Sequence, residues 1–432
     1  MLYGTTFEEL YNENLYKSSS YAQAKLGLES AQVDMNKIDN FFIPYLRLSV
    51  DTMKTGIDPL TGRTTTIGGL VFGGDGEIEG YKLSLNVNFL EVWGTSIGLS
   101  FPFEISFDEF EVGFPWGDEL KDEISLSISR DLTKIDKVDR LNTQSNYYSA
   151  LSNYYMAQTN IFIDTVEDIF NRHYNEKMIE LSQKELEILQ NQYQASTDED
   201  VKKNIEKQIL TAQKTLEGLK SSNASLEYFE YSEELYNQTK NIVKNLTNSN
   251  QNYSKNINER LDLKSLKLKE EASNIQKNFW FMPYMPFTNV SLSFSPFEEE
   301  NKWSMGIGFE LTILDKGERE LASNNMKSNV AMLTYDESLK KVEETVRGLE
   351  TNNKTLNYDL KINQIDLENV LDENNKNVDL YNKGYITKED LELSEISLKR
   401  AQLTKENTEN SLLLNELRIR QQYYVDIWGD KN

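Results

Sequence analysis

The segment Leu132-Thr133-Lys134-Ile135-Asp136-Lys137-Val138-Asp139-Arg140-Leu141 recurs later in the chain as Leu311-Thr312-Ile313-Leu314-Asp315-Lys316-Gly317-Glu318-Arg319-Glu320. Five of the ten positions are identical, and two more carry conservative exchanges. Each copy follows an alternating, strand-like stretch and precedes a long polar stretch with helical spacing. Self-similarity of this kind indicates that a whole structural unit is repeated. The sequence therefore predicts two copies of a unit in which strands lead into a long helix.

Six stretches alternate apolar and polar residues with period two, which is typical of strands with one apolar and one polar face. They cover residues 46–50, 81–89, 97–107, 124–128, 290–294 and 303–311. Their polar positions are mostly Ser, Asn and Gly, and aromatic residues crowd 101–116. Two interpretations are open: a soluble sandwich with a dry core, or a barrel with a lipid-facing surface and a wet interior. Because the smallest membrane barrels need roughly eight strands, a barrel would require several chains to pool their strands.

Two uninterrupted stretches predict unusually long helices. Asp136–Tyr193 and Asp315–Tyr381 contain no proline, and at 1.5 Å per residue each helix would be on the order of 90 to 100 Å long. Apolar residues recur at intervals of three and four, and the other positions are rich in Lys, Glu and Asn. This pattern is typical of the narrow seams of coiled coils.

Each long stretch reaches a breaker and then resumes, which predicts two helical hairpins. At the second break, Gly384 is suited to end a helix, Thr387 to cap the next one, and Asp390 to complete a capping box. At the first break, Ser196 or Thr197 is expected to cap the second helix of the hairpin.

Composition excludes several functions. The 432 residues carry a net charge of −24, whereas phosphate binding needs clustered Lys and Arg, so we expect no nucleic-acid partner. The chain has no cysteine and one histidine, His173, which we interpret as a bystander on a helix face. Acidic runs at 198–200 and 298–300 are interpreted as solvated turns. With no phosphate loop and no Cys/His pair, we expect no catalytic residues, no metal site, no cofactor and no enzyme activity.

The repeat, the strand-to-helix element at 311–319 and the hairpin at 381–391 together resemble the outer-membrane efflux protein family. These are the TolC-like channels of Gram-negative drug-efflux and type I secretion systems. The resemblance implies a mainly α fold with membrane β-strands: a homotrimer whose β-barrel, in outer-membrane lipid, joins a long α-helical barrel of coiled-coil hairpins in the periplasm. It also implies passive conduction from an inner-membrane pump of the RND, ABC or MFS type, through a periplasmic adaptor (membrane fusion) protein, to the outside.

The same resemblance implies roles for the hairpin turns. Asp390 matches an acidic residue that rings the periplasmic aperture; Leu393 replaces the second acidic residue of the pattern, and Glu389 and Glu392 are its candidate substitutes. Tyr381 matches a tyrosine that latches the inner helices, although Ile386 stands where its arginine partner is expected. Eight residues match adaptor-docking positions: Gly384, Tyr385, Thr387, Leu391, Ala195, Ser196, Thr197 and Val201.

The expected organisation has five parts. Residues 1–45 form an N-terminal helix, 46–131 and 283–313 barrel strands, 132–282 a helical tunnel with its tip near 195–201, and 314–432 a tunnel with its tip near 384–391. Pro44 precedes Leu132 by 88 positions, but Pro283 precedes Leu311 by only 28. We expect the additional hairpin in 81–107 to extend the rim of a barrel with four strands per subunit; a wider barrel with six is the alternative. The competing function is a non-transport periplasmic or surface coiled-coil protein with a small β-sandwich head.

Overall fold

The structure of the chain is a computed structural model that describes residues 6–39, 44–54, 65–67, 70–72, 78–92, 95–106, 112–113, 124–131, 136–248, 256–279, 287–295, 302–310 and 318–423. It is mostly helical with a small antiparallel sheet. The chain divides into two compact units. Met1–Gly27, Ala150–Leu263 and Glu337–Asn432 form the first unit, and Leu28–Ser149 and Lys264–Asp336 form the second.

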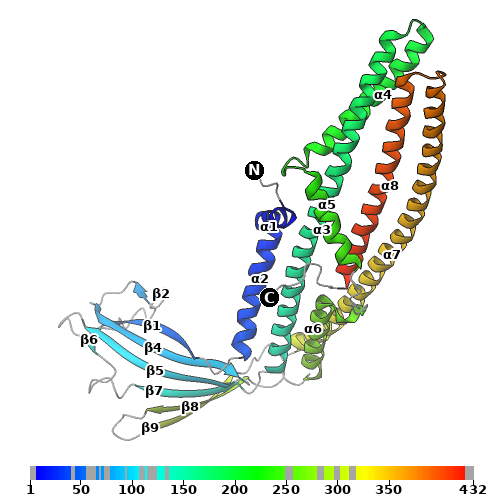
Figure 1. Ribbon diagram of the computed structural model, residues 1–432. Coiled ribbons are helices and arrows are strands. Elements are labelled where there is room, and N and C mark those ends of the chain that lie inside the picture. Colours follow the sequence, from blue (N-terminus) through cyan, green and yellow to red (C-terminus); the bar gives the residue numbers. More distant parts are fainter. Residues whose placement is uncertain are drawn as a thin grey trace. The chain divides into compact units, whose positions relative to one another are not determined.

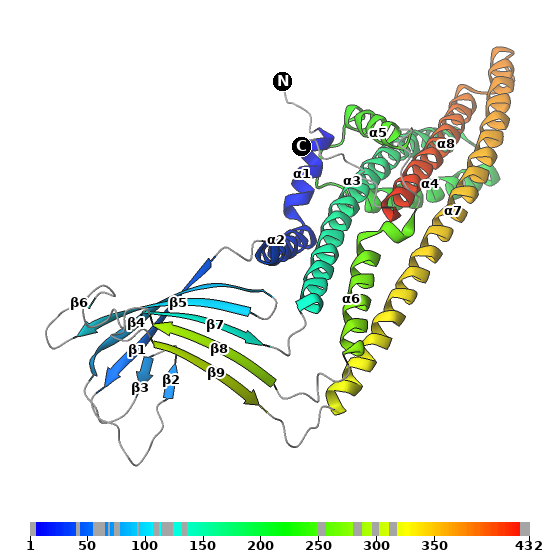
Figure 2. The same cartoon turned by 90° about the horizontal axis from the view of Figure 1, so that it is seen from below.

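The sheet belongs to the second unit and contains all six of the stretches that alternate in the sequence. Its strands lie side by side in one curved layer (Figure 2) in the order β1 (Pro44–Lys54), β4 (Ile78–Val92), β5 (Thr95–Ser106), β7 (Ser125–Asp131), β8 (Phe287–Ser295) and β9 (Lys302–Glu310). Three short strands were not predicted: β6 (Val112–Gly113) pairs with β5, and β2 (Thr65–Ile67) pairs with β3 (Leu70–Phe72). Residues 107, 110, 114–116, 132–135, 283–286, 298–300 and 311–317, which also entered the predictions, lie outside the described residues.

The register places apolar positions on one face of all six strands. One complete row across the sheet consists of Leu46, Val87, Leu99, Leu126, Phe294 and Trp303. The adjacent row, on the opposite face, consists of Tyr45, Asn88, Gly98, Ser127, Ser293 and Ser304. Since successive strand residues alternate between the two faces, the sheet has one apolar face and one face of mostly small polar residues.

The small residues also permit close packing on the polar face. A Cβ atom added at Gly306 would lie 2.6 Å from the Ser291 hydroxyl oxygen, which is closer than non-bonded atoms can approach. The Ser291 hydroxyl donates to the Gly306 carbonyl at 3.4 Å. On the apolar face, Phe294 stacks on Trp303 with ring centroids 4.2 Å apart.

The strand order corrects the expectation of a rim extension. β4 pairs with β1 and β5, and β5 pairs with β4 and β7, so both strands of the additional hairpin use both of their edges within the sheet. The register continues through them because the hairpin presents the same alternation as its neighbours. The sandwich alternative would need a second sheet facing the first, whereas the described strands form one layer and a two-stranded ribbon.

The predicted long helices are confirmed. α3 (Asp136–Ala195) has 60 residues and is followed by α4 (Glu199–Ala224), while α7 (Glu318–Asn382) has 65 residues and is followed by α8 (Lys388–Gln422). The N-terminal segment, expected as one helix over 1–45, forms two helices, α1 (Phe7–Lys17) and α2 (Ser19–Asp39), and β1 begins at Pro44. The remaining helices are α5 (Glu233–Asn248) and α6 (Leu261–Asn278), with a short 3₁₀ turn at Ile257–Glu259. No helix among the described residues is both long and apolar enough to cross a membrane.

In the second unit, the start of α3 packs against α6. Val138 and Leu141 form a small buried cluster with Ala272. The hydroxyl of Ser145 donates to the Ser265 carbonyl, and that of Ser265 donates to the Ser145 carbonyl, each at 2.8 Å. Both serines are buried, and because their side chains are small the two backbones can approach closely.

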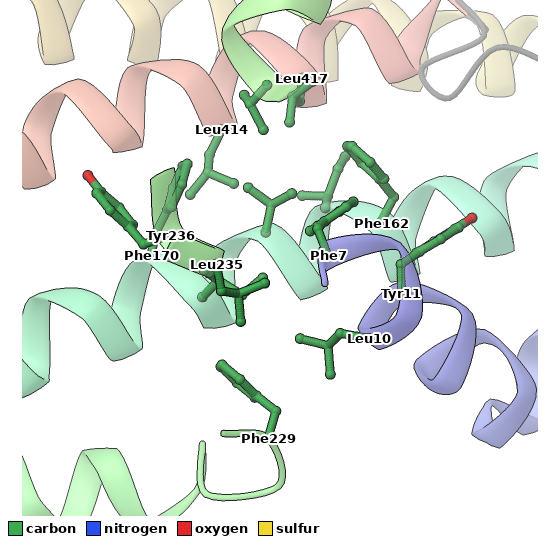
Figure 3. Packing of buried hydrophobic residues seen from close by; sticks show 14 of the residues in the cluster. Phe7, Leu10, Tyr11, Phe162, Phe170, Phe229, Leu235, Tyr236, Leu414 and Leu417 are labelled. Carbon is green, nitrogen blue, oxygen red and sulfur yellow. The ribbon is translucent and has the colours of Figure 1, made fainter. Parts of the chain in front are cut away.

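The first unit contains the largest hydrophobic cluster, in which four helices meet (Figure 3). Phe7, Leu10 and Tyr11 come from α1, Phe162 and Phe170 from α3, Leu235 and Tyr236 from α5, and Leu414 and Leu417 from α8; Phe229 lies in the loop before α5. Phe162 meets the rings of Phe7 and Tyr11 edge-on. Burying side chains of this size stabilises by about 1.5–3 kcal/mol each, so this cluster is the main anchor between α1, α5 and the long helices.

The contact between α7 and α8 is polar over much of its length. Asn352 donates to Asn415 at 3.0 Å, Asn363 donates to Thr408 at 2.8 Å, and the Ser394 hydroxyl donates to Asn374 at 3.0 Å. Side-chain hydrogen bonds therefore recur along the seam of this hairpin.

Candidate functional site at the helical hairpin turns

The turn between α7 and α8 has the predicted geometry. Gly384 has φ +75°, a conformation that glycine adopts without a Cβ penalty. Its amide donates to the Tyr381 carbonyl and the Tyr385 amide to the Leu380 carbonyl, both at 2.9 Å, which is the Schellman arrangement that ends a helix. The predicted capping box is also confirmed: the Thr387 hydroxyl accepts from the Asp390 amide, and the Asp390 carboxylate accepts from the Thr387 amide, both at 3.2 Å.

The turn between α3 and α4 differs from the prediction, because Asp198 is the N-cap, not Ser196 or Thr197. The Asp198 carboxylate accepts from the amides of Asp200 at 2.8 Å and Val201 at 3.3 Å. An ionised carboxylate is the stronger acceptor here, since charge-assisted hydrogen bonds are roughly twice as strong as neutral ones. Its negative charge also faces the positive end of the α4 dipole.

The two turns lie at the same end of the first unit, as Figure 1 also shows. The Gln192 side-chain amide, one turn before the end of α3, donates to the Asp390 carboxylate at 3.2 Å. Asp390 thus caps α8 and accepts from α3 at once. Further from the turns, the Arg400 guanidinium donates to Ser182 at 3.0 Å and to Glu185 at 2.5 Å, and so joins α8 to α3 a second time.

The other predicted residues of the turns are mostly exposed. Tyr385 is 75% exposed and Tyr381 39%. Glu392 forms an ion pair with Lys388 at 3.0 Å, and both Glu389 and Glu392 are half-buried. Ala195, Thr197 and Val201 are exposed, while Ser196 and Leu391 are half-buried. The turns therefore present a mixed surface of small, aromatic and acidic side chains.

A polar cluster that the sequence analysis missed lies among α3, α5 and α8. His173, interpreted from the sequence as a bystander on a helix face, is only 5% exposed and has polar partners. Its Nδ1 atom lies 2.7 Å from the Tyr231 hydroxyl, and its Nε2 atom 3.5 Å from the Glu406 carboxylate. Its ring stacks on that of Tyr236 at 3.6 Å. The signal was present in the sequence, because Phe162, Val166, Ile169 and His173 follow one another at helical spacing on the buried stripe of α3.

Glu406 is the centre of this cluster. Its carboxylate accepts from the Lys240 ammonium at 2.6 Å and from the Tyr236 hydroxyl at 2.7 Å. The hydrogen bond from His173, together with those from Lys240 and Tyr236, holds the pKa of Glu406 well below its usual range. Burial raises the pKa of Tyr231 and of Tyr236 to about 12. The arrangement therefore favours an ionised Glu406 between neutral tyrosines and a charged lysine, which suits a structural tie between helices.

Comparison with solved structures identifies the fold as that of outer-membrane channels. The CmeC outer-membrane channel of Campylobacter jejuni superposes with a TM-score of 0.58 at 13% identity, over 96% of this chain and 85% of CmeC. The outer-membrane protein VceC of Vibrio cholerae gives 0.52 at 14% identity, over 96% and 95%. The open state of the MtrE outer-membrane channel of Neisseria gonorrhoeae gives 0.52 at 12% identity, over 96% and 88%.

Sequence comparison adds nothing to this structural likeness. No protein-family model matches the chain, and no curated protein sequence matches it. At identities this low the superpositions establish the fold alone: a mostly helical chain with a small antiparallel sheet, like that of the outer-membrane channels.

Proposed function

We propose that the chain is the outer-membrane exit duct of a tripartite efflux or type I secretion system. Three copies form one channel, with 46–131 and 283–313 supplying the barrel and 132–282 and 314–432 the periplasmic tunnel. An inner-membrane pump delivers the cargo through a periplasmic adaptor, and the duct conducts it passively, without catalysis or a cofactor.

The two-faced sheet is the observation that carries this proposal. β1, β4 and β5 have 11, 15 and 12 residues, and a membrane-spanning strand needs about 9–11. On the apolar face, Trp303 and Met305 are 63% and 67% exposed within the chain. A soluble protein would have to cover such a face, whereas lipid covers it in a barrel, and the small polar face suits a water-filled lumen.

The hairpin turns support the proposed contacts with an adaptor and the proposed aperture. Gly384 and Tyr385 form an exposed turn at the end of the α7–α8 hairpin, which is a suitable surface for a protein partner. Glu389, Asp390 and Glu392 lie in the first turns of α8. Three copies around an axis would form an acidic ring, and rings of carboxylates favour cations.

The first experiment asks whether the chain forms a membrane duct. The full chain is produced with an export signal, extracted from outer membranes in detergent, sized by light scattering and reconstituted in planar bilayers. We expect a trimer that conducts ions and prefers cations, and we expect Glu389→Gln to weaken that preference. A protein that remains in the aqueous fraction without detergent and is electrically silent would refute the duct.

A second experiment tests the docking turn. Gly384→Trp places a large side chain on the turn, where a Cβ atom has open space but φ is strained. Gly218→Trp is the matched control, since Gly218 lies within α4 and a Cβ atom there also meets nothing within 4 Å. We expect only Gly384→Trp to abolish export while trimers still assemble. Normal export by Gly384→Trp would remove the turn from the docking surface.

A further inference from the structure

The additional hairpin β4–β5 lies inside the wall of the sheet. β1 pairs with β4 at eleven positions, from Pro44↔Phe89 to Lys54↔Ile78, and β4 pairs with β5 at eleven more. Between β1 and β7 there is no direct pairing among the described residues, because β4 and β5 occupy that place. An appendage on a four-stranded wall would instead leave β1 beside β7.

The hairpin also carries the same two faces as the rest of the sheet. Leu99 on β5 pairs with Leu126 on β7, which pairs with Phe294 on β8. On the opposite face, Gly98 pairs with Ser127, which pairs with Ser293. Ile97 on β5 and Leu292 on β8 are exposed to nearly the same extent, 38% and 36%. A hairpin surrounded by water on both sides would have no reason to keep an apolar face in register with the membrane strands.

The strand directions allow the sheet to close with further copies. All neighbours on the path from β1 to β9 are antiparallel, and six strands make the first and the last run in opposite directions. β9 of one copy can therefore pair antiparallel with β1 of the next, and the head-to-tail contact closes a ring that leaves no open edge toward lipid.

We propose that each copy contributes six strands to the membrane wall, so that three copies close an 18-stranded barrel. This inference rests on the proposed function. Barrel diameter grows roughly linearly with strand number, so 18 strands give a barrel about 1.5 times as wide as the 12 strands expected from four per subunit. Barrels of 16–18 strands enclose a water-filled channel. The membrane section therefore admits bulkier cargo than a 12-stranded barrel does.

The test compares β5 with β8 by site-directed fluorescence. The chain has no cysteine of its own, so Leu99→Cys, Ser100→Cys, Leu292→Cys and Ser293→Cys each accept one polarity-sensitive dye. The labelled trimers are placed in liposomes and exposed to spin-labelled lipid or to aqueous iodide. We expect lipid to quench the dye at 99 and 292, and iodide to quench it at 100 and 293.

Each result has a distinct meaning. If quenching alternates between lipid and iodide on β8 but iodide quenches both positions on β5, the hairpin lies outside the membrane wall. The 18-stranded barrel is then wrong, although the proposed function as a duct is not affected. If β8 does not alternate either, the strands do not line a membrane pore, and the proposed function fails together with the inference.

A disulfide test does not depend on lipid. Ser127 pairs with Gly98 on one side and with Ser293 on the other. We expect Gly98→Cys/Ser127→Cys and the control Ser127→Cys/Ser293→Cys both to form a bond within one chain, seen as a faster band on a non-reducing gel. If the control pair forms its disulfide while Gly98→Cys/Ser127→Cys does not, the placement of β5 beside β7 is wrong.

Discussion

Replacing Glu406 by Gln is expected to weaken the attachment of α8 to α5, because it removes the charge that neutralises Lys240. The Lys240 ammonium lies 2.6 Å from the carboxylate, and the two side chains are 12% and 31% exposed. A glutamine can still accept from Tyr236, but it leaves the lysine without a counter-charge. Removing one partner of a buried ion pair costs about 3–5 kcal/mol, and because Glu406 is partly exposed we expect about 2–3 kcal/mol.

The loss is measured by guanidinium unfolding of the full chain in detergent, followed by circular dichroism. Glu409→Gln is the matched control on the same helix, since Glu409 pairs with Lys405 at 3.8 Å on a more exposed surface and should cost at most about 0.5 kcal/mol. The double variant Glu406→Gln/Lys240→Met should be less destabilised than the sum of the two single variants, by at least about 1 kcal/mol. Equal losses of unfolding free energy in the Glu406 and Glu409 variants would refute the stabilising role of the Glu406–Lys240 pair. So would a double variant whose loss equals the sum of the two single losses.

The same carboxylate sets a dependence on pH. The pKa of Glu406 is lowered in the folded chain, whereas the pKa of a glutamate in an unfolded chain is about 4.3. Its stabilising contribution is therefore complete above that value and is lost as the pH falls below it. We expect acid to destabilise the wild-type chain more steeply than Glu406→Gln, and parallel pH profiles would contradict this reasoning.

Three further predictions concern the first unit. Leu417→Ala should cost about 3–5 kcal/mol because the side chain is fully buried, whereas Leu210→Ala, at an exposed position of α4, should leave the denaturation midpoint unchanged. Gly384→Ala should cost about 1 kcal/mol through its positive φ, and an unchanged midpoint would show that the turn relaxes. Asp198→Ala should cost about 1 kcal/mol and Thr197→Ala almost nothing; the opposite order would restore Thr197 as the cap.

Local patterns in the sequence predicted most of the elements correctly. The alternation of apolar residues located all six long strands, and the absence of proline located α3 and α7. Gly384, Thr387 and Asp390 predicted one turn in full, because a helix stop and a capping box depend on neighbouring residues. The other turn was harder, since Ser196, Thr197 and Asp198 are all good caps and only the observed end of α3 selects among them.

What the sequence did not reveal depends on contacts between distant residues. The place of β4 and β5 in the sheet is decided by pairing with β1 and β7, and an alternating hairpin has the same pattern whether it lies inside a sheet or beside one. Similarly, His173 acquires its role from Tyr231 and Glu406, which are 58 and 233 positions away. Helical spacing indicates that such a residue is buried, but not what it meets.

The hydrogen bonds that asparagine side chains of α7 form with α8 affect how this hairpin can move. A coiled-coil seam made of leucines resists separation because moving the helices apart exposes apolar side chains to water. Here Asn352, Asn363 and Asn374 would exchange their partners for water, and a typical neutral hydrogen bond contributes only about 0.5–1.5 kcal/mol net. Sliding one helix along the other would instead separate all three pairs at once, because each Asn meets its partner at a fixed position along α8. These hydrogen bonds thus allow α7 and α8 to move apart at modest cost, but they resist sliding of one helix along the axis of the other.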